Sequence, residues 1–283
     1  MSKQSLASKL ISWFDKNKRD LPWRNTSPWG VFISEFMLQQ TPVNRVTPIW
    51  HEWMERWPTP DALASAPKSE VIKAWGRLGY PRRALRLHES AKIIAKEHGG
   101  MVPRAREDLI ALPGVGDYTA SAIAAFAFGE SALVLDINIR RFFARYFDGE
   151  QFPSSAPSLV ERKIRTELIP TKRGDTWAAA TMEFGALICT SKSPQCNECF
   201  LIDSCAWRAA GYPLMEIKRQ AKFEGSDRQC RGVVMKALRE KNRVSKVALE
   251  KEWNNYSQLE KALETLIADG LIETTGKSFR LAS

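Results

Sequence analysis

LPGVGDYTASAIAAFAFGESALVLD, residues 112–136, is the stretch from which the fold of this chain can be worked out. It begins with a tight turn, because Pro113 restricts φ whereas Gly114 and Gly116 allow positive φ and leave backbone N–H groups uncovered. The run that follows, residues 118–128, is almost wholly apolar and is typical of a buried helix. The sequence therefore predicts a glycine turn that leads into a buried helix.

The end of the same stretch predicts a second helix. Gly129 suits the C-cap that closes the first helix, and Asp136 suits the N-cap that begins the next one. Asn138 and the basic pair Arg140 and Arg141 follow directly. The amides of a glycine turn and the dipole of the helix after it both favour an anion, so this arrangement is suited to binding a phosphate. A helical hairpin with a purely structural role explains these residues equally well.

Length and charge narrow the class of protein. The chain has 283 residues, 44% of them hydrophobic, which is enough to bury a substantial core. The 42 Lys and Arg residues exceed the 32 Asp and Glu residues and give a net charge of +10, so the expected partner is a polyanion such as nucleic acid. Charge alone does not separate DNA, RNA and a membrane surface. No apolar run approaches the roughly 20 residues of a membrane helix, and the N-terminus has no signal-peptide core, so we expect a cytoplasmic protein.

The segment VFISEFMLQQ, residues 31–40, places one acid among apolar neighbours. On a helix, Glu35 shares its face with Val31 and Phe32 one turn before it and with Leu38 and Gln39 one turn after it. A carboxyl group in such surroundings keeps its proton to a higher pH, as a general acid near neutral pH must do. Most glutamates on helices are simply solvated, so the pattern by itself does not prove a catalytic role.

Four of the five cysteines lie within one short segment. Cys189, Cys196, Cys199 and Cys205 have the spacing C-x6-C-x2-C-x5-C, which in a reducing compartment indicates a metal site. Zinc is the usual ion for four cysteines, but a zinc ribbon uses two CxxC pairs and this segment has one. Cys230 falls outside the group, and we expect it to be an ordinary thiol.

Three motifs resemble those of one family. LPGVG, the buried helix after it and VLDIN at 134–138 are similar to the helix-hairpin-helix and catalytic aspartate of the DNA glycosylase superfamily that contains endonuclease III and MutY. SEFMLQQT at 34–41 resembles the SEVMLQQT signature of MutY-type adenine glycosylases, and LGYPRRALRLH at 78–88 resembles their LGYYxRAxxLH. The resemblance implies a mainly α, two-lobed helix-hairpin-helix core over roughly residues 1–213.

The resemblance also implies the chemistry. Glu35 would protonate the adenine that leaves, and Asp136 would stabilise the positive sugar, a division of labour like that of glycoside hydrolysis. Gln40 and Tyr80 would fill the gap left when the base is extruded from the duplex. Tyr118 and Asn138 join the expected catalytic group. The expected base or DNA contacts are Arg24, Leu38, Gln39, Gln40, Thr41, Tyr80, Gly114, Val115, Gly116, Glu183, Ser191 and Lys192.

The family pattern sharpens two expectations and leaves one open. Endonuclease III-type enzymes carry a lysine where this chain has Tyr118, so a monofunctional glycosylase that does not nick the strand is expected. The cysteine spacing matches the family's [4Fe-4S] loop, which implies an iron–sulfur cluster with a structural role and a DNA-contacting loop at Ser191 and Lys192. Pro81 replaces the second tyrosine of the family motif, and the sequence gives no consequence for this change.

The expected domain organisation has four parts. Residues 26–131 form a helical lobe with the hairpin, and residues 1–25 together with 132–213 form the lobe with the cysteine loop. Residues 214–225 are polar and indicate a linker. Residues 226–283 show three amphipathic segments and a hairpin-like end, similar to a small winged-helix domain. Such domains bind DNA or protein, so the role of this one stays open.

The expected function is removal of adenine mispaired with 8-oxoguanine or guanine, by a monomer acting on double-stranded DNA. A thymine or uracil mismatch glycosylase is the nearest alternative among enzymes. A non-catalytic iron–sulfur DNA-binding regulator is the alternative from another class, and the intact Glu35 and Asp136 argue against it. Longer family members read 8-oxoguanine with a Nudix-like C-terminal domain, whose motif this chain does not show.

Overall fold

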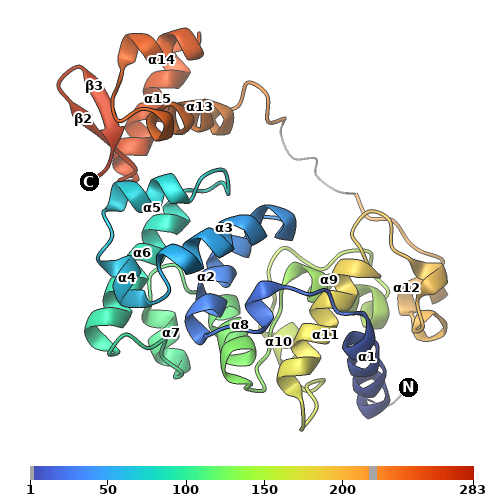
Figure 1. Cartoon of the computed structure of the whole chain (residues 1–283). Coiled ribbons are helices and arrows are strands. Elements are labelled where there is room, and N and C mark those ends of the chain that lie inside the picture. The colour runs from blue at the N-terminus through green and yellow to red at the C-terminus, as the bar shows by residue number, and fades with distance from the viewer. Residues whose placement is uncertain (1–2, 217–221) are drawn as a thin grey trace. The chain divides into compact units, whose positions relative to one another are not determined.

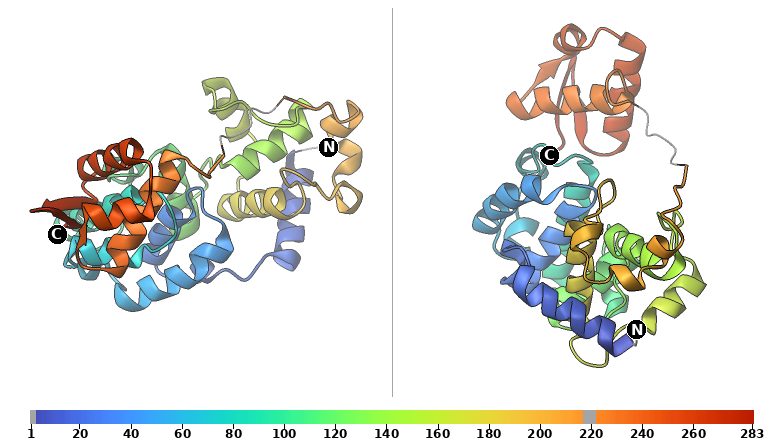
Figure 2. Two further views of the ribbon diagram at one scale, coloured as in Figure 1. Left: turned by 90° about the horizontal axis from the view of Figure 1, so that it is seen from above. Right: turned by 90° about the vertical axis from the view of Figure 1, so that its right-hand side faces the viewer.

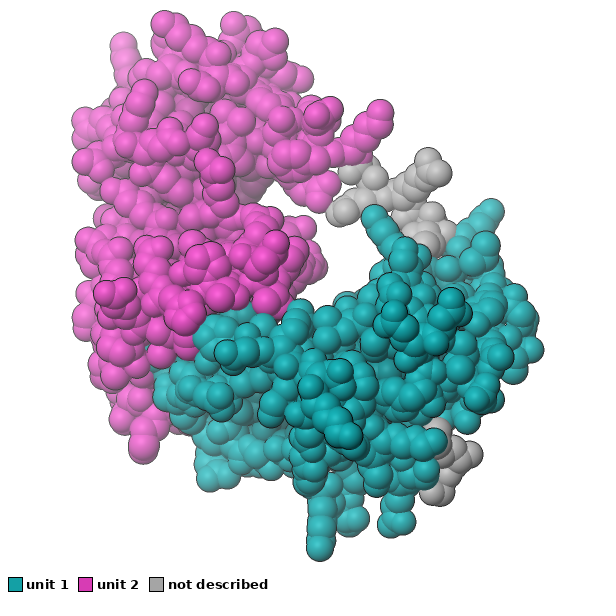
Figure 3. Space-filling view, turned by 45° about the vertical axis from the view of Figure 1, so that its right-hand side comes forward, with its two compact units in different colours: residues 1–32, 104–111, 115–217 teal, residues 33–103, 112–114, 218–283 magenta. Residues whose placement is uncertain are grey.

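The computed structural model describes residues 3–216 and 222–283 (Figure 1). Its described elements are helices, apart from three short strands near the C-terminus, so the predicted mainly α fold is confirmed. Contacts divide the chain into two compact units (Figure 3). Unit 1 comprises residues 1–32, 104–111 and 115–217, and unit 2 comprises residues 33–103, 112–114 and 218–283.

Unit 1 is built around a hydrophobic core shared by four helices. Each helix contributes buried side chains to that core, for example Leu10 from α1, Ala125 from α8, Phe142 from α9 and Phe184 from α11. The elements of unit 1 are α1 (Lys3–Asn17), η1 (Pro22–Arg24), α7 (Arg106–Ala111), α8 (Asp117–Phe128), α9 (Ile137–Phe143), the π-helical η2 (Ala144–Asp148), α10 (Leu159–Thr166), α11 (Gly174–Leu187), η3 (Cys196–Glu198), η4 (Ile202–Ser204) and α12 (Ala206–Ala209). Helix α2 (Pro28–Leu38) begins in unit 1 and ends in unit 2.

The first part of unit 2 is a cluster of helices around tryptophans. Its helices are α3 (Val43–Arg56), α4 (Pro60–Ala64), α5 (Lys68–Ala74) and α6 (Arg82–Glu97). Trp53 lies edge-to-face with Trp57 and with Trp75, and its indole N–H donates to the Ala74 carbonyl at 3.1 Å. These rings anchor α3 to α5.

Residues 222–283 form the winged-helix-like part of unit 2. It contains α13 (Asp227–Glu240), β1 (Val244–Ser245), α14 (Lys246–Glu252), α15 (Tyr256–Ala268), β2 (Ile272–Thr275) and β3 (Ser278–Leu281). The sheet is antiparallel with strand order β1-β3-β2, and Figure 2 shows the three helices gathered beside it. The predicted helices and hairpin are confirmed, whereas the two-residue β1 was missed. Ile72 and Leu85 belong to the same hydrophobic cluster, so this part packs on α5 and α6.

Three local features differ from the sequence expectations. Helix α2 ends at Leu38, so Gln39 and Gln40 lie in a turn rather than in the helix. Gly114 has the expected positive φ of 84°, but Gly116 is extended with φ −106° and needs no special freedom. The expected lobe boundary at residue 131 does not coincide with the compact units, because α7 and α8 belong to unit 1. No helix among the described residues is long and apolar enough to span a membrane.

Candidate active site and cysteine loop

Glu35 is a buried acid in an apolar helix. Its residue is 5% exposed, and its neighbours Ser34 and Phe36 are fully buried. Helix α2 has almost no other polar side chain, since it reads PWGVFISEFML. Glutamate is rarely buried unless it is paired or functional, so the position is unusual for a glutamate on a helix. Glu35 is therefore not one of the solvated glutamates that are usual on helices.

Asp136 is the N-cap of α9, as expected. Its Oδ1 accepts the backbone N–H of Ile139 at 2.6 Å, and its Oδ2 accepts the side-chain amide of Asn138 at 2.6 Å. Burial raises the pKa of the Asp136 carboxyl, whereas these hydrogen bonds and the Arg141 charge act in the opposite direction. The carboxylate is therefore held in one orientation by two donors that favour its ionised form.

Helix α9 connects Asp136 to the cysteine loop through Arg141. The Arg141 guanidinium donates to Asn138 Oδ1 at 3.0 Å, to the Gly185 carbonyl at 2.5 Å and to the Cys189 carbonyl at 2.9 Å. A Cβ on Gly185 would lie 2.5 Å from the Asn138 carbonyl oxygen, so α11 reaches α9 this closely only with glycine there. A continuous hydrogen-bond chain thus runs from Asp136 through Asn138 and Arg141 to Cys189.

Arg145 holds the chain that follows Cys189. It donates to the carbonyls of Thr190 at 2.7 Å and Ser191 at 3.1 Å, and to the Cys189 sulfur at 3.6 Å. Ser191 and Lys192 are exposed beside these contacts. Arg145 therefore holds the backbone carbonyls of Thr190 and Ser191, while the side chains of Ser191 and Lys192 remain accessible.

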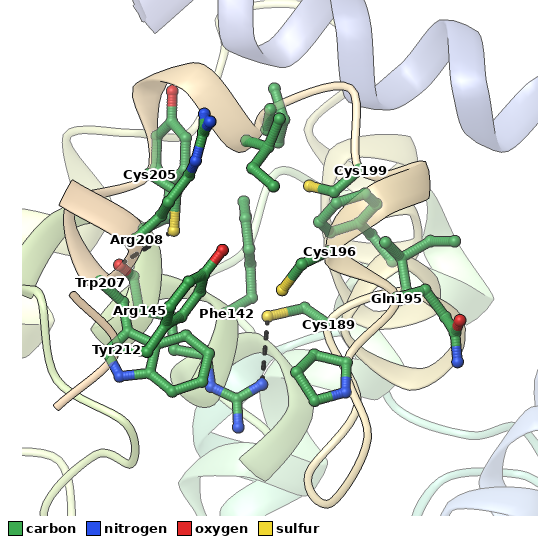
Figure 4. Close-up of a pocket in the computed structure, with 16 residues that line it drawn as sticks. Phe142, Arg145, Cys189, Gln195, Cys196, Cys199, Cys205, Trp207, Arg208 and Tyr212 are labelled. Carbon is green, nitrogen blue, oxygen red and sulfur yellow. Dashed lines mark hydrogen bonds between the residues drawn. The ribbon is translucent and has the colours of Figure 1, made fainter. Parts of the chain in front are cut away.

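The four clustered cysteines line one pocket with about 410 Å³ of open space (Figure 4). Each is half-buried, and their sulfurs are directed into the pocket beside Phe142. In the described part of the chain, no group of three or more His, Cys, Asp or Glu residues is arranged to hold a single metal ion. The arrangement thus brings the four predicted ligands together around one pocket. Cys230 is apart from them and fully buried, as expected for an ordinary thiol.

The two expected wedge residues share an unusual backbone. Gln40 has φ 55° and Tyr80 has φ 45°, which is the left-handed region where non-glycine residues are strained. Gln40 is exposed and Tyr80 is 51% exposed. Leu38 and Gln39 are half-buried, whereas Thr41 is buried and bonded within the protein. Gln40 and Tyr80 are therefore the members of this group with side chains most available to DNA.

The hairpin glycine is required by packing. A Cβ on Gly114 would lie 2.8 Å from the Phe36 ring and 3.1 Å from Arg86, so no larger residue fits without displacement. Val115 is buried and Gly116 is exposed. Tyr118 is half-buried near the start of α8.

Glu183 is engaged differently from the expectation. Its Oε1 accepts the backbone N–H and Nε of Arg19 at 2.8 and 3.0 Å, and its Oε2 lies 2.8 Å from Arg19 Nη2 and 3.1 Å from Arg24 Nη2. The Arg24 guanidinium also lies over the Phe14 ring at 4.9 Å. These ion pairs, chiefly the hydrogen bonds from Arg19, outweigh burial and lower the pKa of Glu183. The carboxylate serves here to join α11 to the segment after α1, rather than having both oxygens open to a base.

Several arginines with evident structural roles were not found from the sequence: Arg19, Arg83, Arg141 and Arg145. All bond to groups far away along the chain. One usable signal was present, because Arg141 and Arg145 are embedded in the aromatic run RRFFARYF, where a solvated basic face is not expected.

Comparisons with known proteins agree with this geometry. Residues 33–168 match the family described as HhH-GPD superfamily base excision DNA repair protein. The chain is 46% identical over 272 residues to an adenine DNA glycosylase of Mycolicibacterium smegmatis, which covers 94% of this chain and 92% of the relative. It is 41% identical over 212 residues to an adenine DNA glycosylase of Homo sapiens, covering 70% of this chain and 38% of the relative.

Two solved structures are similar in fold. A thermostable thymine-DNA glycosylase has a TM-score of 0.68 at 29% identity and covers 74% of this chain and 97% of its own. A non-covalent endonuclease III–DNA complex has a TM-score of 0.64 at 23% identity and covers 75% of this chain and 98% of its own. The second likeness concerns the fold alone.

The raised pKa of Asp136 predicts how Asp136→Asn changes stability with pH. Below the ordinary value of 3.8, the carboxyl is neutral in both the folded and the unfolded chain. As the pH rises above 3.8, the unfolded chain ionises first, so the wild type loses stability until the folded carboxyl also ionises. Asparagine cannot ionise. The free energy of unfolding of the wild type minus that of the variant should therefore fall with rising pH.

Urea unfolding of both proteins from about pH 3 to about pH 7 measures this difference, because the other titrating groups cancel. A difference that increases with pH would mean that the folded carboxyl has a lowered pKa instead.

Proposed function

Because the chain belongs to the HhH-GPD superfamily of base excision DNA repair proteins, we propose that it is a monofunctional adenine DNA glycosylase that acts on adenine mispaired with 8-oxoguanine or guanine. The observation that carries this proposal is the similarity at 46% identity to an adenine DNA glycosylase over 94% of this chain and 92% of the relative. A second adenine DNA glycosylase, from Mycobacterium tuberculosis, is 44% identical over 274 residues. The buried Glu35 and the capped Asp136 supply the two carboxyl groups that the reaction needs.

The reaction replaces the bond from C1′ of the deoxyribose to adenine with a bond from C1′ to water. Glu35 gives its proton to the adenine ring, so the base leaves as a neutral molecule. Asp136 stays ionised and stabilises the positive charge that develops on the sugar. Water then adds to C1′ and gives up a proton to the Glu35 carboxylate, which restores both residues. The bonds from Ile139 and Asn138 keep the Asp136 carboxylate oriented while this charge develops.

The base has to leave the duplex before this chemistry can occur. Extrusion costs a few kcal/mol of stacking and pairing energy, which side chains inserted into the gap offset. Gln40 and Tyr80 are suited to this role because both are exposed and project from tight turns. Thr41 contributes by supporting the turn, since its hydroxyl bonds to the Leu78 carbonyl at 3.0 Å.

DNA binding follows from charge and from the hairpin. The net charge of +10 favours a polyanion, and the amides around Gly114 and Gly116 at the start of α8 suit a phosphate. Arg24 and the exposed Ser191 and Lys192 are further proposed contacts to the nucleic acid. We propose that the protein acts as a monomer on double-stranded DNA in the cytoplasm.

Position 118 determines whether the strand is cut. A bifunctional glycosylase uses a lysine there to form a Schiff base with the sugar, and Tyr118 has no amine for this step. Base release without strand cleavage is therefore the proposed outcome. Thymine is the alternative substrate, favoured by the 29% identical thymine-DNA glycosylase structure. Adenine has the stronger support because the matching relatives are more similar and cover more of the chain.

The cysteine pocket fits a [4Fe-4S] cluster better than zinc. Four thiolates are the donor set of a [4Fe-4S] cluster, and Cys189, Cys196, Cys199 and Cys205 line one pocket. Their spacing contains a single CxxC pair, whereas a zinc ribbon uses two. The cluster would join the loop to the unit 1 core and leave the chemistry to the carboxyl groups.

Glu35→Gln tests the assignment of the proton donor. The variant keeps the size and hydrogen-bonding reach of the side chain but cannot donate a proton of the same acidity, so adenine release should slow by about 10²–10⁴-fold. Duplex binding should remain close to that of the wild type. Single-turnover adenine release and fluorescence anisotropy measure the two effects, with Glu97→Gln, an exposed glutamate on α6, as the matched control. A rate of adenine release within tenfold of the wild-type rate would show that Glu35 is not the proton donor.

The cluster assignment predicts the colour and metal content of the protein. The purified wild type should be brown, with broad absorbance near about 400 nm and iron rather than zinc by elemental analysis. Cys199→Ser should lose the colour and bind DNA more weakly, because the loop with Ser191 and Lys192 loses its anchor. Cys230→Ser should keep both properties, since Cys230 lies in the core of the C-terminal part. A colourless, folded wild type that contains zinc alone would contradict the assignment.

A further inference from the structure

Arg83 on α6 is a buried arginine whose polar contacts lie at the end of α2 with the turn after it, and in the turn before α6. The residue is 7% exposed. Its Nη1 donates to the carbonyls of Phe36 at 2.8 Å, Met37 at 3.1 Å and Gln39 at 2.5 Å. Its Nη2 donates to Thr41 Oγ1 at 2.9 Å and to the carbonyls of Leu78 at 3.3 Å and Gly79 at 3.0 Å. One guanidinium thus joins the end of α2 to the turn before α6.

These partners are dipoles rather than charges. Among the described residues, no carboxylate is bonded to Arg83, and its guanidinium lies over the rings of Trp75 at 5.1 Å and Tyr80 at 5.8 Å. Burial lowers the pKa of Arg83 to about 10, so the group still carries its charge near neutral pH. A buried charge without a counter-ion is costly unless its donors are satisfied. Here the carbonyls and Thr41 satisfy both Nη groups and the rings lie against the guanidinium, whereas Nε has no hydrogen-bond partner.

The bonded carbonyls lie directly beside the two strained residues. The Gln39 carbonyl precedes Gln40, which has φ 55°, and the Gly79 carbonyl precedes Tyr80, which has φ 45°. Left-handed backbone at non-glycine residues is strained and persists only where the surroundings impose it. Arg83 fixes the peptide group before each residue, so it imposes both conformations at once.

We propose that Arg83 is a positioning residue that holds Gln40 and Tyr80 in their strained conformations, so that both side chains enter the DNA as one preformed unit. This inference rests on the proposed function, because it gives those two residues the task of filling the gap left by an extruded base. Preorganisation of this kind lowers the entropy that has to be lost when the side chains enter the duplex. Arg83 itself touches neither the base nor the sugar in this proposal.

The geometry requires arginine in particular. Its planar fork reaches three carbonyls with Nη1 and the second turn with Nη2. Lysine has the same charge, but its N–H donors all lie on one nitrogen and cannot reach both turns. Arg83→Lys should therefore keep the buried charge and lose the hydrogen bonds to one of the turns. Arg165→Lys is the matched control, because Arg165 is also buried and also stacks on aromatic rings, but belongs to unit 1.

The test measures base extrusion separately from bond cleavage. Stopped-flow fluorescence of 2-aminopurine placed opposite 8-oxoguanine follows extrusion, and single-turnover assays follow adenine release. Arg83→Lys should slow extrusion by about tenfold or more, which corresponds to about 1.4 kcal/mol of lost positioning. Arg165→Lys should stay within about twofold of the wild type. Thr41→Val, which removes one hydroxyl of the same network and no charge, should slow extrusion less and in the same direction.

A double-mutant comparison separates positioning from general stability. In a Gln40→Ala, Tyr80→Ala background, Arg83→Lys should change extrusion by less than about twofold, because the residues it positions are absent. The proposal is overturned if Arg83→Lys leaves extrusion unchanged in the wild-type background, or slows it equally in both backgrounds. A wild type that extrudes the base but releases no adenine overturns the proposed function alone. A wild type that extrudes no base overturns both.

Discussion

Buried guanidinium groups bonded to main-chain carbonyls are the interaction on which both units depend. In unit 1, Arg141 and Arg145 bind carbonyls of the cysteine loop, and in unit 2, Arg83 binds carbonyls at the end of α2 and in the turns after α2 and before α6. Such turns cannot pair their carbonyls within a helix or sheet, and each buried carbonyl left without a donor costs about 1–3 kcal/mol. Arginine supplies several donors in a rigid fork and keeps its charge when it is buried. Irregular segments thereby gain fixed conformations without regular secondary structure.

This interaction ties the proposed chemistry to the proposed cluster. Asp136 accepts from Asn138 at 2.6 Å, Asn138 accepts from Arg141 at 3.0 Å, and Arg141 donates to the Cys189 carbonyl at 2.9 Å. A single helix, α9, therefore orients the carboxylate at its start and holds the first cysteine along its length. Distortion of the cysteine loop would be transmitted to Asn138 and then to the carboxylate. A cluster with a purely structural role can in this way affect the rate of base removal.

Features of the fold that depend on neighbouring residues could be predicted from the sequence. The Gly129 C-cap, the Asp136 N-cap and the three helices and hairpin of the C-terminal part follow from local turn and cap chemistry, and all are confirmed. Features that depend on distant residues could not. The carbonyl of Gln39, just after α2 ends at Leu38, is bonded by Arg83, which lies 44 residues further along the chain. Glu183 forms an ion pair with Arg19, which is 164 residues away in the sequence, and no local sequence pattern predicts that pair.

Comparative kinetics on four duplexes decide whether this chain removes adenine from mispairs. Single-turnover base release is measured with A·8-oxoG, A·G, A·C and T·G duplexes that are otherwise identical. We expect release of adenine from A·8-oxoG and A·G, an intact strand until alkali is added, and no release of thymine from T·G. Release of thymine from T·G at a rate equal to or above that of adenine from A·8-oxoG would contradict it.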